Sequence, residues 1–490
     1  MDLNNYTLLC DFYELTMANG YFQTDYKETI TYFDLFYRKN PDKGGFVIFA
    51  GLESIVEYIK NLHFFDDDIE YLRRKGIFCE EFLEYLKDFK FTGDIYAVKE
   101  GTPVFPYEPL ITVRAKAIEA QLIETYLLLA VNHQSLIATK TSRIVRAAEG
   151  RPVMEFGSRR AQGTAAAILG ARSAYIAGAI GTSNAQADRD YGVPALGTMA
   201  HSLVTEEKDE YTAFLGYAKA NPNNCVFLVD TYDTLKSGVK NAIKVAKDYL
   251  TPNNLPFKGI RIDSGDLAYL SKEARKLLDA SGYKETTICL SNSLDEFTIK
   301  DLIEQGASFN SLGVGDNIAA SKERLGGVYK LVAVTKNNEI SPRMKVSDNP
   351  FKTTTPGFKK TIRFYDKETG YALGDVVALR EEIINEEQYT LVDSTETWKK
   401  KTISNYIIRE LQVPIFIRGQ KVYQTPSITE KQAYCQKEYD TLYPEVTRLL
   451  NPHEYYVDLS DKLRELKENM IIASRKEEEI IWMPKNKLEK

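Results

Sequence analysis

Two carboxylates follow an apolar run in the segment GIRIDSGDL, and they are the most specific chemical signal in the sequence. Asp263 and Asp266 stand three residues apart, with a serine and a glycine between them. Such a turn offers oxygen ligands and a close backbone approach, which suits ribose hydroxyls or a hydrated Mg²⁺ ion. Arg261 precedes Asp263 by two residues and therefore lies on the same side of a strand. There it could pair with an anionic ligand or with Asp263 itself, and a structural turn with a buried ion pair is the alternative.

The segment EFGSRRAQG combines an aromatic ring with two guanidinium groups, namely Phe156, Arg159 and Arg160. Arginine recognises carboxylate and phosphate groups through two parallel hydrogen bonds. A phenyl face beside it would suit a flat aromatic ligand. Adjacent residues point in different directions, so we expect only one of the two arginines to face a pocket. An exposed Arg-Arg pair at the start of a helix is the alternative.

His201 follows a run of small residues in VPALGTMAHSLV and is one of 4 histidines in the chain. No Ser-His-Asp relay or metal-ligand partner stands near it in the sequence. A lone histidine is more often structural than catalytic. The small neighbours nevertheless leave room for a bulky group at the ring, so a nucleophilic role stays open.

Gly313 and Gly315, in SLGVGDNIA, could present backbone N–H groups to a phosphate. A G-x-G pattern is a weak signal alone, but it gains weight in the last loops of a barrel, where phosphates commonly bind. The sequence contains no G-x-x-x-x-G-K-[ST] and no complete G-x-G-x-x-G after the first strand, so ATP would not bind through a P-loop. The segment VFLVDTYDTLKSG resembles a ribose-phosphate loop only weakly, because it lacks adjacent acids.

An alternation of short apolar runs and helical stretches must position these groups. Helices are expected at 236–250, 267–280 and 296–305. Six apolar runs end in small or polar clusters, at 152–160, 177–185, 226–234, 259–267, 287–295 and 308–316. Buried strands separated by helices predict a parallel sheet with covered faces. Six such units favour an incomplete β/α barrel, in which the loops after the strands carry the chemistry. Those loops hold Arg159, Arg160, Ser183, Asp230, Asp263, Asp266, Asn292 and Gly315.

The segments before and after the predicted barrel show other sequence patterns. Strands are expected at 30–37, 94–98 and 110–113, and two helices at 119–148. After 328 the chain alternates as β-rich segments do, and from about 390 it becomes charged and helical, with proline breaks. Near the start, DFYELTMANGYF places Tyr13 on a helix outside the barrel, where an aromatic stripe is usually core.

Composition bounds the class of protein. A length of 490 residues suggests roughly three domains at about 150 residues each. The 69 acidic residues exceed the 63 basic ones, and this acidity excludes a general nucleic-acid coat. The 5 cysteines never form C-x-x-C, which predicts reduced thiols and no zinc site. The most apolar long stretch, 165–180, contains Arg172 and is too short to span a membrane. The N-terminus carries acids where a secretion signal would be basic. We therefore expect a soluble cytoplasmic protein that binds no membrane.

Taken together and in this order, six segments resemble the nicotinate phosphoribosyltransferase family: DFYELTMANGYF, EFGSRRAQG, GTSNA, GTMAHS, IRIDSGDL and GVGD. The resemblance covers most of the chain. It implies an α/β fold with an irregular, incomplete β/α barrel, an α/β sandwich domain that is discontinuous in sequence, and a helical C-terminal segment. The expected divisions are 1–115 for the first part of the sandwich, 116–328 for the barrel, 329–390 for the returning β-rich part and 391–490 for the charged helical region.

Members of this family join nicotinate to 5-phosphoribosyl 1-pyrophosphate and so begin NAD salvage from nicotinate. The products are nicotinate mononucleotide and pyrophosphate, and the hydrolysis of ATP to ADP and phosphate is coupled to the step. The resemblance therefore implies ATP as a co-substrate, Mg²⁺ carried mainly by the substrate phosphates, and a homodimer with shared active sites. The expected partners are small molecules, with no nucleic acid.

The resemblance also implies roles for individual residues. His201 matches the histidine that ATP phosphorylates, and Asp263 matches an acid near the ribose. Phe156 and Tyr13 match the aromatic pair that encloses the pyridine ring, with the tyrosine supplied by the neighbouring subunit. Further substrate contacts are expected from Arg159, Ser183, Thr198 and Arg261, and ribose or phosphate contacts from Asp266, Asn292, Ser293, Gly313 and Gly315.

One position departs from the family pattern. Many relatives carry threonine or another small hydroxyl residue after the GVG element, whereas this chain has Asp316. An acid there would repel a phosphate unless it faced away, so Asp316 is not among the expected site residues.

Four other functions fit the sequence less well. Nicotinamide-specific relatives carry an acid where this chain has Ser183, and a quinolinate enzyme would need more basic residues for a second carboxylate. A phosphosugar aldolase or isomerase would need a strand-end lysine or a Glu/His pair, and none of the six strand-end segments offers a lysine. A non-catalytic nucleotide-binding protein would leave the strand-end acids without a purpose.

Overall fold

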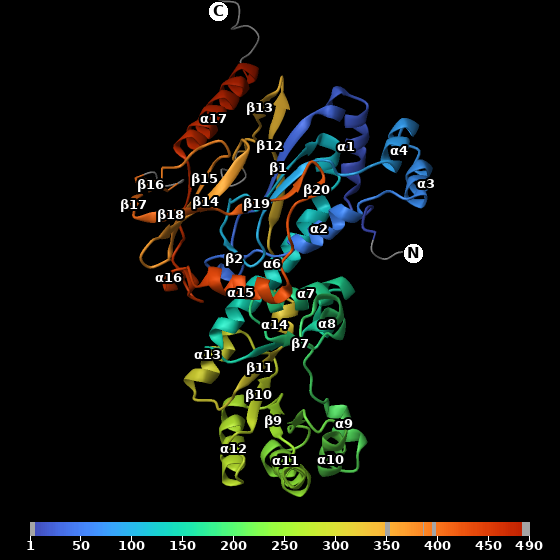
Figure 1. Ribbon diagram of the computed structural model, residues 1–490, viewed down its shortest axis with the longest axis vertical. Coiled ribbons are helices and arrows are strands. Elements are labelled where there is room, and N and C mark those ends of the chain that lie inside the picture. Colours follow the sequence, from blue (N-terminus) through green and yellow to red (C-terminus); the bar gives the residue numbers. More distant parts are fainter. Residues whose placement is uncertain (1–4, 348–352, 386, 394–397, 483–490) are drawn as a thin grey trace, which may run out of the picture. The chain divides into compact units, whose positions relative to one another are not determined.

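The computed structural model describes residues 5–347, 353–385, 387–393 and 398–482, and the chain divides into two compact units (Figure 1). The first unit comprises Met1–Leu136, Glu323–Pro426 and Lys437–Lys490, and the second comprises Ile137–Lys322 and Ser427–Gln436. Both units are therefore discontinuous in sequence. Within the described residues, no helix is long and apolar enough to cross a membrane.

A six-stranded parallel sheet forms the centre of the second unit, the green and yellow part of Figure 1. Its strands are β6 (Val153–Glu155), β7 (Gly181–Thr182), β8 (Cys225–Leu228), β9 (Phe257–Ile262), β10 (Thr287–Ser291) and β11 (Ser311–Val314). They lie in the order β7-β6-β11-β10-β9-β8, so β7 and β8 are edges and the curled sheet does not close. The incomplete β/α barrel predicted from the sequence is confirmed.

Helices separate most of these strands, as the alternating pattern predicts. The connecting helices include α7 (Thr164–Ile176), α11 (Val239–Val245), α12 (Leu267–Ala280), α13 (Glu296–Glu304) and α14 (Asp316–Ala319). Between the two edge strands, the chain forms α8 (Ala185–Tyr191), α9 (His201–Glu206) and α10 (Glu210–Ala220). The segment that carries His201 therefore belongs to the connection between the open edges of the sheet.

The main sheet of the first unit combines strands from both flanks of the barrel. Its order is β13-β12-β1-β5-β3-β19-β20. The early strands are β1 (Ile30–Tyr37), β3 (Asp94–Val98) and β5 (Ile111–Lys116), close to the expected ranges. The later strands are β12 (Gly327–Lys336), β13 (Glu339–Pro342), β19 (Gln412–Ile417) and β20 (Gln420–Lys421). β1 pairs with β5 on one side and with β12 on the other, so the early and late parts of the chain share one sheet.

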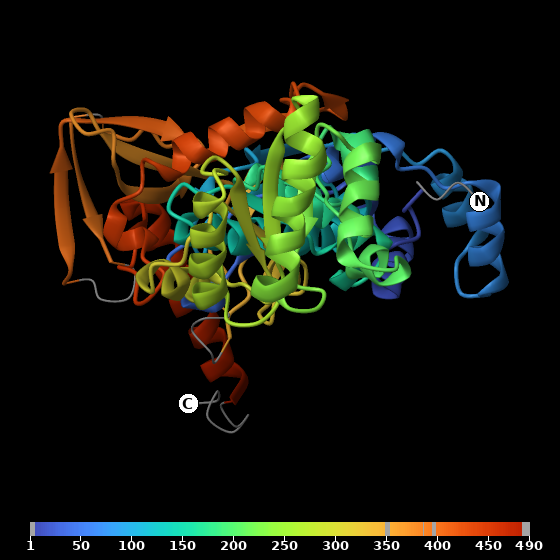
Figure 2. The same cartoon turned by 90° about the horizontal axis from the view of Figure 1, so that it is seen from below.

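A second sheet of this unit has the order β18-β14-β15-β21. It consists of β18 (Tyr406–Glu410), β14 (Lys359–Asp366), β15 (Ala372–Leu379) and β21 (Val457–Leu459), beside a hairpin of β16 (Gln388–Val392) and β17 (Lys400–Ser404). Figure 2 shows these orange strands at one side of the unit and the blue helices α3 (Asp66–Arg74) and α4 (Glu80–Lys87) at the other.

The C-terminal region is helical in α15 (Ile428–Tyr439), α16 (Pro444–Thr447) and α17 (Asp461–Trp482). It nevertheless begins with strands, because residues 400–421 contribute β17 to β20. In residues 400–421, the alternation of apolar side chains is short and follows a run of lysines. The sequence pattern therefore indicates a charged segment rather than β-strands. Residues 394–397 and 483–490 of the expected helical region lie outside the described residues.

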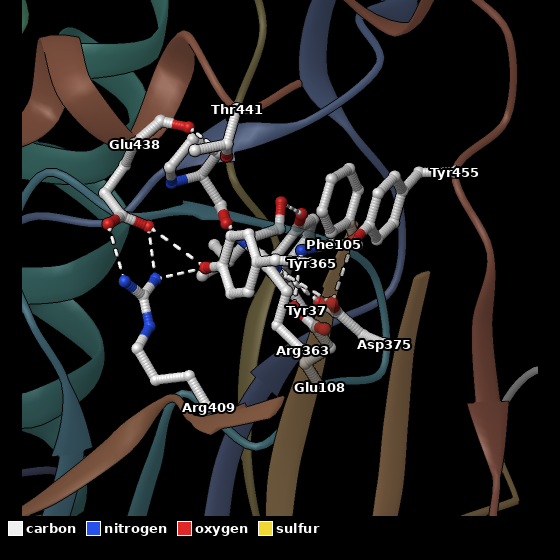
Figure 3. A network of polar contacts seen from close by, with 12 residues as sticks. Tyr37, Phe105, Glu108, Arg363, Tyr365, Asp375, Arg409, Glu438, Thr441 and Tyr455 are labelled. Carbon is white, nitrogen blue, oxygen red and sulfur yellow. Dashed lines mark hydrogen bonds and ion pairs between the residues drawn. The ribbon is translucent and has the colours of Figure 1, made fainter. Parts of the chain in front are cut away.

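A buried ion pair within the second sheet of the first unit also contacts segments outside that sheet (Figure 3). Arg363 and Asp375 are fully buried, and the Arg363 Nη2 lies 2.7 Å from the Asp375 Oδ2. Arg363 also donates to the Pro103 carbonyl at 2.9 Å, and the Tyr455 hydroxyl donates to Asp375 at 2.9 Å. Burial, together with the Asp375 charge, raises the pKa of Glu108 well above its usual range. Removing one member of such a buried pair typically costs about 3–5 kcal/mol.

Helix α1 (Phe12–Phe22) carries a buried acid next to the expected substrate contact Tyr13. Glu14 is 0% exposed, and its Oε1 accepts the Thr125 backbone N–H at 3.1 Å and the Thr125 hydroxyl at 2.5 Å. Burial raises the pKa of Glu14 from 4.5 to about 7, although the hydrogen bonds from Thr125 oppose the shift.

This shift predicts how stability depends on pH. Because the pKa of Glu14 is 4.5 in the reference state and about 7 when folded, the folded protein binds more protons between these values. The free energy of unfolding should therefore fall as pH rises through this window and then level off. Glu14→Gln has no carboxyl group to titrate at this position. The unfolding temperature of the variant minus that of the wild type should therefore increase from pH 5 to pH 8. An unfolding-temperature difference that stays constant from pH 5 to pH 8 would contradict the assignment. Glu57→Gln, at an exposed ion pair, is the matched control.

Candidate active site

The carboxyl ends of three neighbouring strands meet at Asp263. Asp263 follows β9, and its Oδ1 accepts the hydroxyl of Ser291, the last residue of β10, at 2.5 Å. Asp230 follows β8, and its Oδ2 accepts the Asp263 backbone N–H at 3.0 Å and the Ser264 hydroxyl at 2.5 Å. Adjacent parallel strands end at the same edge of a sheet, so residues far apart in the sequence form one polar cluster here.

Asp230 is a central residue of this cluster that the sequence analysis did not place in the site. Its side chain is nearly buried, with 8% of the residue exposed. The Oδ1 is buried and has no hydrogen-bond partner in the described part of the chain. Burying a carboxylate oxygen without a partner is costly, so this oxygen is suited to contact a ligand or an ordered water. The available signal was its place at a strand end in VFLVDTYDT, which the poor match to a ribose-phosphate loop outweighed.

His201 lies at this same cluster. It begins α9, and its Nδ1 lies 3.1 Å from the Thr231 hydroxyl oxygen. Its Nε2 lies 3.9 Å from the Asp263 Oδ2, and 43% of the His201 side chain is exposed. The structure therefore brings the two expected catalytic residues together, with the ring oriented by Thr231 and accessible to solvent. Thr231 is a second residue that the sequence analysis did not single out.

Arg261 and Thr198 meet at Met199, the residue that directly follows Thr198. The Arg261 Nη2 donates to the Met199 carbonyl at 3.3 Å, and the Thr198 hydroxyl lies 3.5 Å from the same oxygen. Arg261 forms no ion pair with a described residue, although the sequence left a pairing with Asp263 open. Its Nε is buried without a hydrogen-bond partner among the described residues. The guanidinium group therefore keeps donors available for an anion.

Glycines determine how closely Phe156 approaches the end of β11. A Cβ atom added at Gly313 would lie 2.6 Å from two carbons of the Phe156 ring, so only glycine fits beneath this ring. A Cβ atom added at Gly157 would lie 2.7 Å from the Gly315 carbonyl oxygen. Gly313 lies within β11, whereas Gly315 precedes α14, so the first makes room for the ring and the second belongs to the loop.

Glu155 joins the loops that carry Phe156 and Ser183. The buried Glu155 carboxylate accepts the Thr182 hydroxyl at 2.5 Å and also the Gly157 backbone N–H. Burial raises its pKa, whereas these hydrogen bonds oppose the shift. The Ser183 backbone N–H donates to the Glu155 carbonyl at 2.9 Å, and the Ser183 side chain is exposed at the end of β7.

The remaining expected residues of the barrel lie on the neighbouring loops. Arg159 is exposed in the short 3-10 helix Ser158–Arg160. Asn292 and Ser293 follow β10 with left-handed φ angles of 96° and 50°. Such angles are rare outside glycine and mark a constrained turn. Asp266 caps α12 by accepting the Tyr269 backbone N–H at 2.9 Å, which gives one of its oxygens a structural role.

Tyr13 belongs to the first unit and is not part of this strand-end cluster. It lies on α1 and is 44% exposed. Among the described residues, no group of three or more His, Cys, Asp and Glu side chains is arranged to hold a metal ion.

Comparison with known proteins identifies the family. The nicotinate phosphoribosyltransferase of Bacillus subtilis is 42% identical over 479 residues, which cover 97% of each chain. The chain belongs to the nicotinate phosphoribosyltransferase family. Its family models match at residues 8–132 (N-terminal domain), 152–378 (family) and 358–467 (C-terminal domain). The resemblance inferred from the six sequence segments is confirmed.

Other nicotinate phosphoribosyltransferases are similar over nearly the whole chain. The pncB2 protein of Mycobacterium tuberculosis (strain H37Rv) is 38% identical and covers 93% of this chain and 92% of its own. The crystal structure of the human nicotinic acid phosphoribosyltransferase has a TM-score of 0.83 at 29% identity and covers 94% of this chain and all of that one. A nicotinate-nucleotide pyrophosphorylase from Pyrococcus furiosus has a TM-score of 0.69 at 22% identity and shares the fold.

Proposed function

We propose that this chain transfers the phosphoribosyl group of 5-phosphoribosyl 1-pyrophosphate to nicotinate and releases pyrophosphate, at the entry to NAD salvage. The observation that carries the proposal is the strand-end cluster of His201, Asp263 and Asp230. This cluster lies in the incomplete barrel. The proteins that are similar to this chain over nearly its full length are nicotinate phosphoribosyltransferases.

The reaction needs stabilisation of positive charge more than it needs a base. As pyrophosphate departs, C1 of the ribose gains oxocarbenium character, which the Asp263 carboxylate can stabilise. The nicotinate nitrogen is already a nucleophile, so the protein must mainly hold it in line with C1. The Phe156 ring over Gly313 offers a flat surface for the pyridine, and the unpaired donors of Arg261 suit its carboxylate.

The carboxylates present also fit a magnesium ion that enters with the substrate. Mg²⁺ keeps several waters and takes one or two protein carboxylates alongside substrate phosphates. The buried Oδ1 of Asp230, which has no partner among the described residues, and the neighbouring Asp263 form such a donor set. When bound, the ion would neutralise the charge of the leaving pyrophosphate.

ATP coupling is part of the proposal and depends on His201. The ring is exposed, and Thr231 holds it by one nitrogen, so the other edge can accept a phosphoryl group from ATP. A phosphorylated His201 would place a charge of about −2 next to Asp263. That charge would reorganise the pyrophosphate subsite, and hydrolysis of the phosphoryl group would draw the transfer toward product.

The active site is proposed to be completed in a homodimer. Tyr13 is the expected second face of the nicotinate sandwich, contributed by the neighbouring subunit. Around it, the chain exposes several large apolar side chains, namely Tyr6, Leu9, Phe12 and Met17. Exposed apolar side chains gathered on one short segment are typical of an interaction surface.

Nicotinate and nicotinamide can be distinguished directly. The purified protein with nicotinate, 5-phosphoribosyl 1-pyrophosphate, Mg²⁺ and ATP should release pyrophosphate and ADP together. Residue 183, at the end of β7, is an uncharged serine, so it does not repel the carboxylate of nicotinate. Ser183→Asp should therefore lower kcat/KM for nicotinate by about tenfold or more, because the added carboxylate repels that of nicotinate. Consumption of nicotinamide by the wild type at a comparable rate would rule out the nicotinate assignment.

The role of His201 can be tested separately from the transfer itself. His201→Ala should lose the dependence on ATP and take up no label from γ-phosphate-labelled ATP, while it keeps some uncoupled transfer. His453→Ala, at an exposed histidine of the first unit, should behave as the wild type. An unchanged ATP requirement in His201→Ala would refute the phosphohistidine.

A further inference from the structure

Asp316 stands directly after Gly315, in the loop where the sequence predicts a phosphate. A carboxylate at this position would oppose a phosphate by charge repulsion. In the structure, its Oδ1 accepts the Arg160 Nε at 3.0 Å. Arg160 comes from the neighbouring loop after β6, so this ion pair joins the loop after β6 to the loop after β11.

The backbones beneath this ion pair are closely packed. The Phe156 N–H donates to the Val314 carbonyl at 2.8 Å, and the Arg160 N–H donates to the Gly157 carbonyl at 2.8 Å. A Cβ atom added at Gly157 would lie 2.5 Å from the Ala319 Cβ, so Gly157 packs tightly against α14. The base of the Arg160 side chain is therefore fixed relative to the GVGD loop.

The charged ends of the pair, in contrast, are accessible. The side chains of Arg160 and Asp316 are 56% and 55% exposed. Exposed ion pairs contribute little to stability, so turning the Arg160 guanidinium away from Asp316 costs little. A phosphate offers more charge than a carboxylate and accepts two parallel N–H bonds from arginine, so it competes well for the same guanidinium.

We propose that Arg160 binds the 5′-phosphate of the phosphoribosyl substrate and that Asp316 holds Arg160 at the loop until this phosphate arrives. The inference rests on the proposed function, because that function supplies the phosphorylated substrate. It assigns a use to the residue that departs from the family pattern: Asp316 holds the arginine in place, and the arginine cancels the repulsion that the acid would otherwise cause.

The neighbouring loop is positioned in the same way. The Asn317 Nδ2 donates to the Ser293 carbonyl at 3.2 Å and to the Leu294 carbonyl at 3.0 Å. The first two residues of α14 thus reach both adjacent loops, Asp316 to the loop after β6 and Asn317 to the loop after β10. Since Asn292 and Ser293 are expected ribose or phosphate contacts, the phosphate groups would meet three loops that are already held together.

Steady-state kinetics on a set of variants tests the proposal. Arg160→Ala should raise KM for 5-phosphoribosyl 1-pyrophosphate by about tenfold or more, since a cation is lost and Asp316 is left uncompensated. KM for nicotinate should change by less than about twofold, because the charge lost is the phosphate's partner. Asp316→Thr removes both the anchor of Arg160 and the acid that repels the phosphate; because these two effects oppose each other, KM for the phosphoribosyl substrate should change by less than about threefold. The double variant should be less impaired than Arg160→Ala alone, because it removes the repelling acid as well.

A matched control comes from an exposed ion pair on α8 of the same unit. Arg189 and Asp190 are bonded at 2.7 Å, and Arg189→Ala should leave both KM values unchanged. Two results would overturn the proposal: an unchanged KM for the phosphoribosyl substrate in Arg160→Ala, or equal increases in Arg160→Ala and Asp316→Thr with no further loss in the double variant. The second pattern would mark a purely structural pair.

Calorimetric titration with ribose 5-phosphate separates this inference from the proposed function. If the wild type forms no nicotinate mononucleotide, the proposed function fails. Weaker binding of ribose 5-phosphate to Arg160→Ala than to the wild type would still support the phosphate contact. Equal affinities of the two proteins would overturn it. Circular dichroism of each variant excludes loss of fold as the cause.

Discussion

The Asp230 carboxylate joins the carboxyl ends of β8 and β9, and the geometry of the candidate active site depends on this contact. One of its oxygens accepts both the Asp263 N–H and the Ser264 hydroxyl, which fixes the turn after β9. Asp263 can then accept from Ser291 with one oxygen and face His201 with the other. Because Thr231 directly follows Asp230, the same strand end also orients the histidine ring. A single, nearly buried acid thus places groups from three strands and one helix.

The first unit depends on a different constraint, the pairing of buried charges between distant parts of the chain. Arg363 on β14 reaches Asp375 and the Pro103 carbonyl, and Lys359 on β14 lies 2.8 Å from Asp34 on β1. These contacts join residues from before and after the barrel. A discontinuous unit needs such long-range contacts, because its parts are separated by nearly two hundred residues of the second unit.

Much of the barrel could be predicted from the sequence, because buried parallel strands are apolar throughout and end in small or polar residues. The same logic placed Asp263, Asn292 and Gly315 at strand ends. The assignment of His201 to the site came from the family resemblance, since spacing cannot bring an isolated histidine to a strand end. Asp230 and Arg160 were also placed at strand ends, but the contacts Asp230–Asp263 and Arg160–Asp316 were missed for a related reason: they join segments that only the folded sheet brings together. The strands at 400–421 were hidden by the lysines in front of them.

The most direct test of the active-site cluster compares Asp230→Ala with Asp230→Asn in the transfer reaction. We expect Asp230→Ala to lower kcat by about tenfold or more, because the Asp263 N–H and the Ser264 hydroxyl lose their acceptor and the turn after β9 is released. Asp230→Asn should retain more activity, since its amide oxygen can still accept from both donors. A folded Asp230→Ala protein with the kcat of the wild type would contradict the central claim that this carboxylate organises the site.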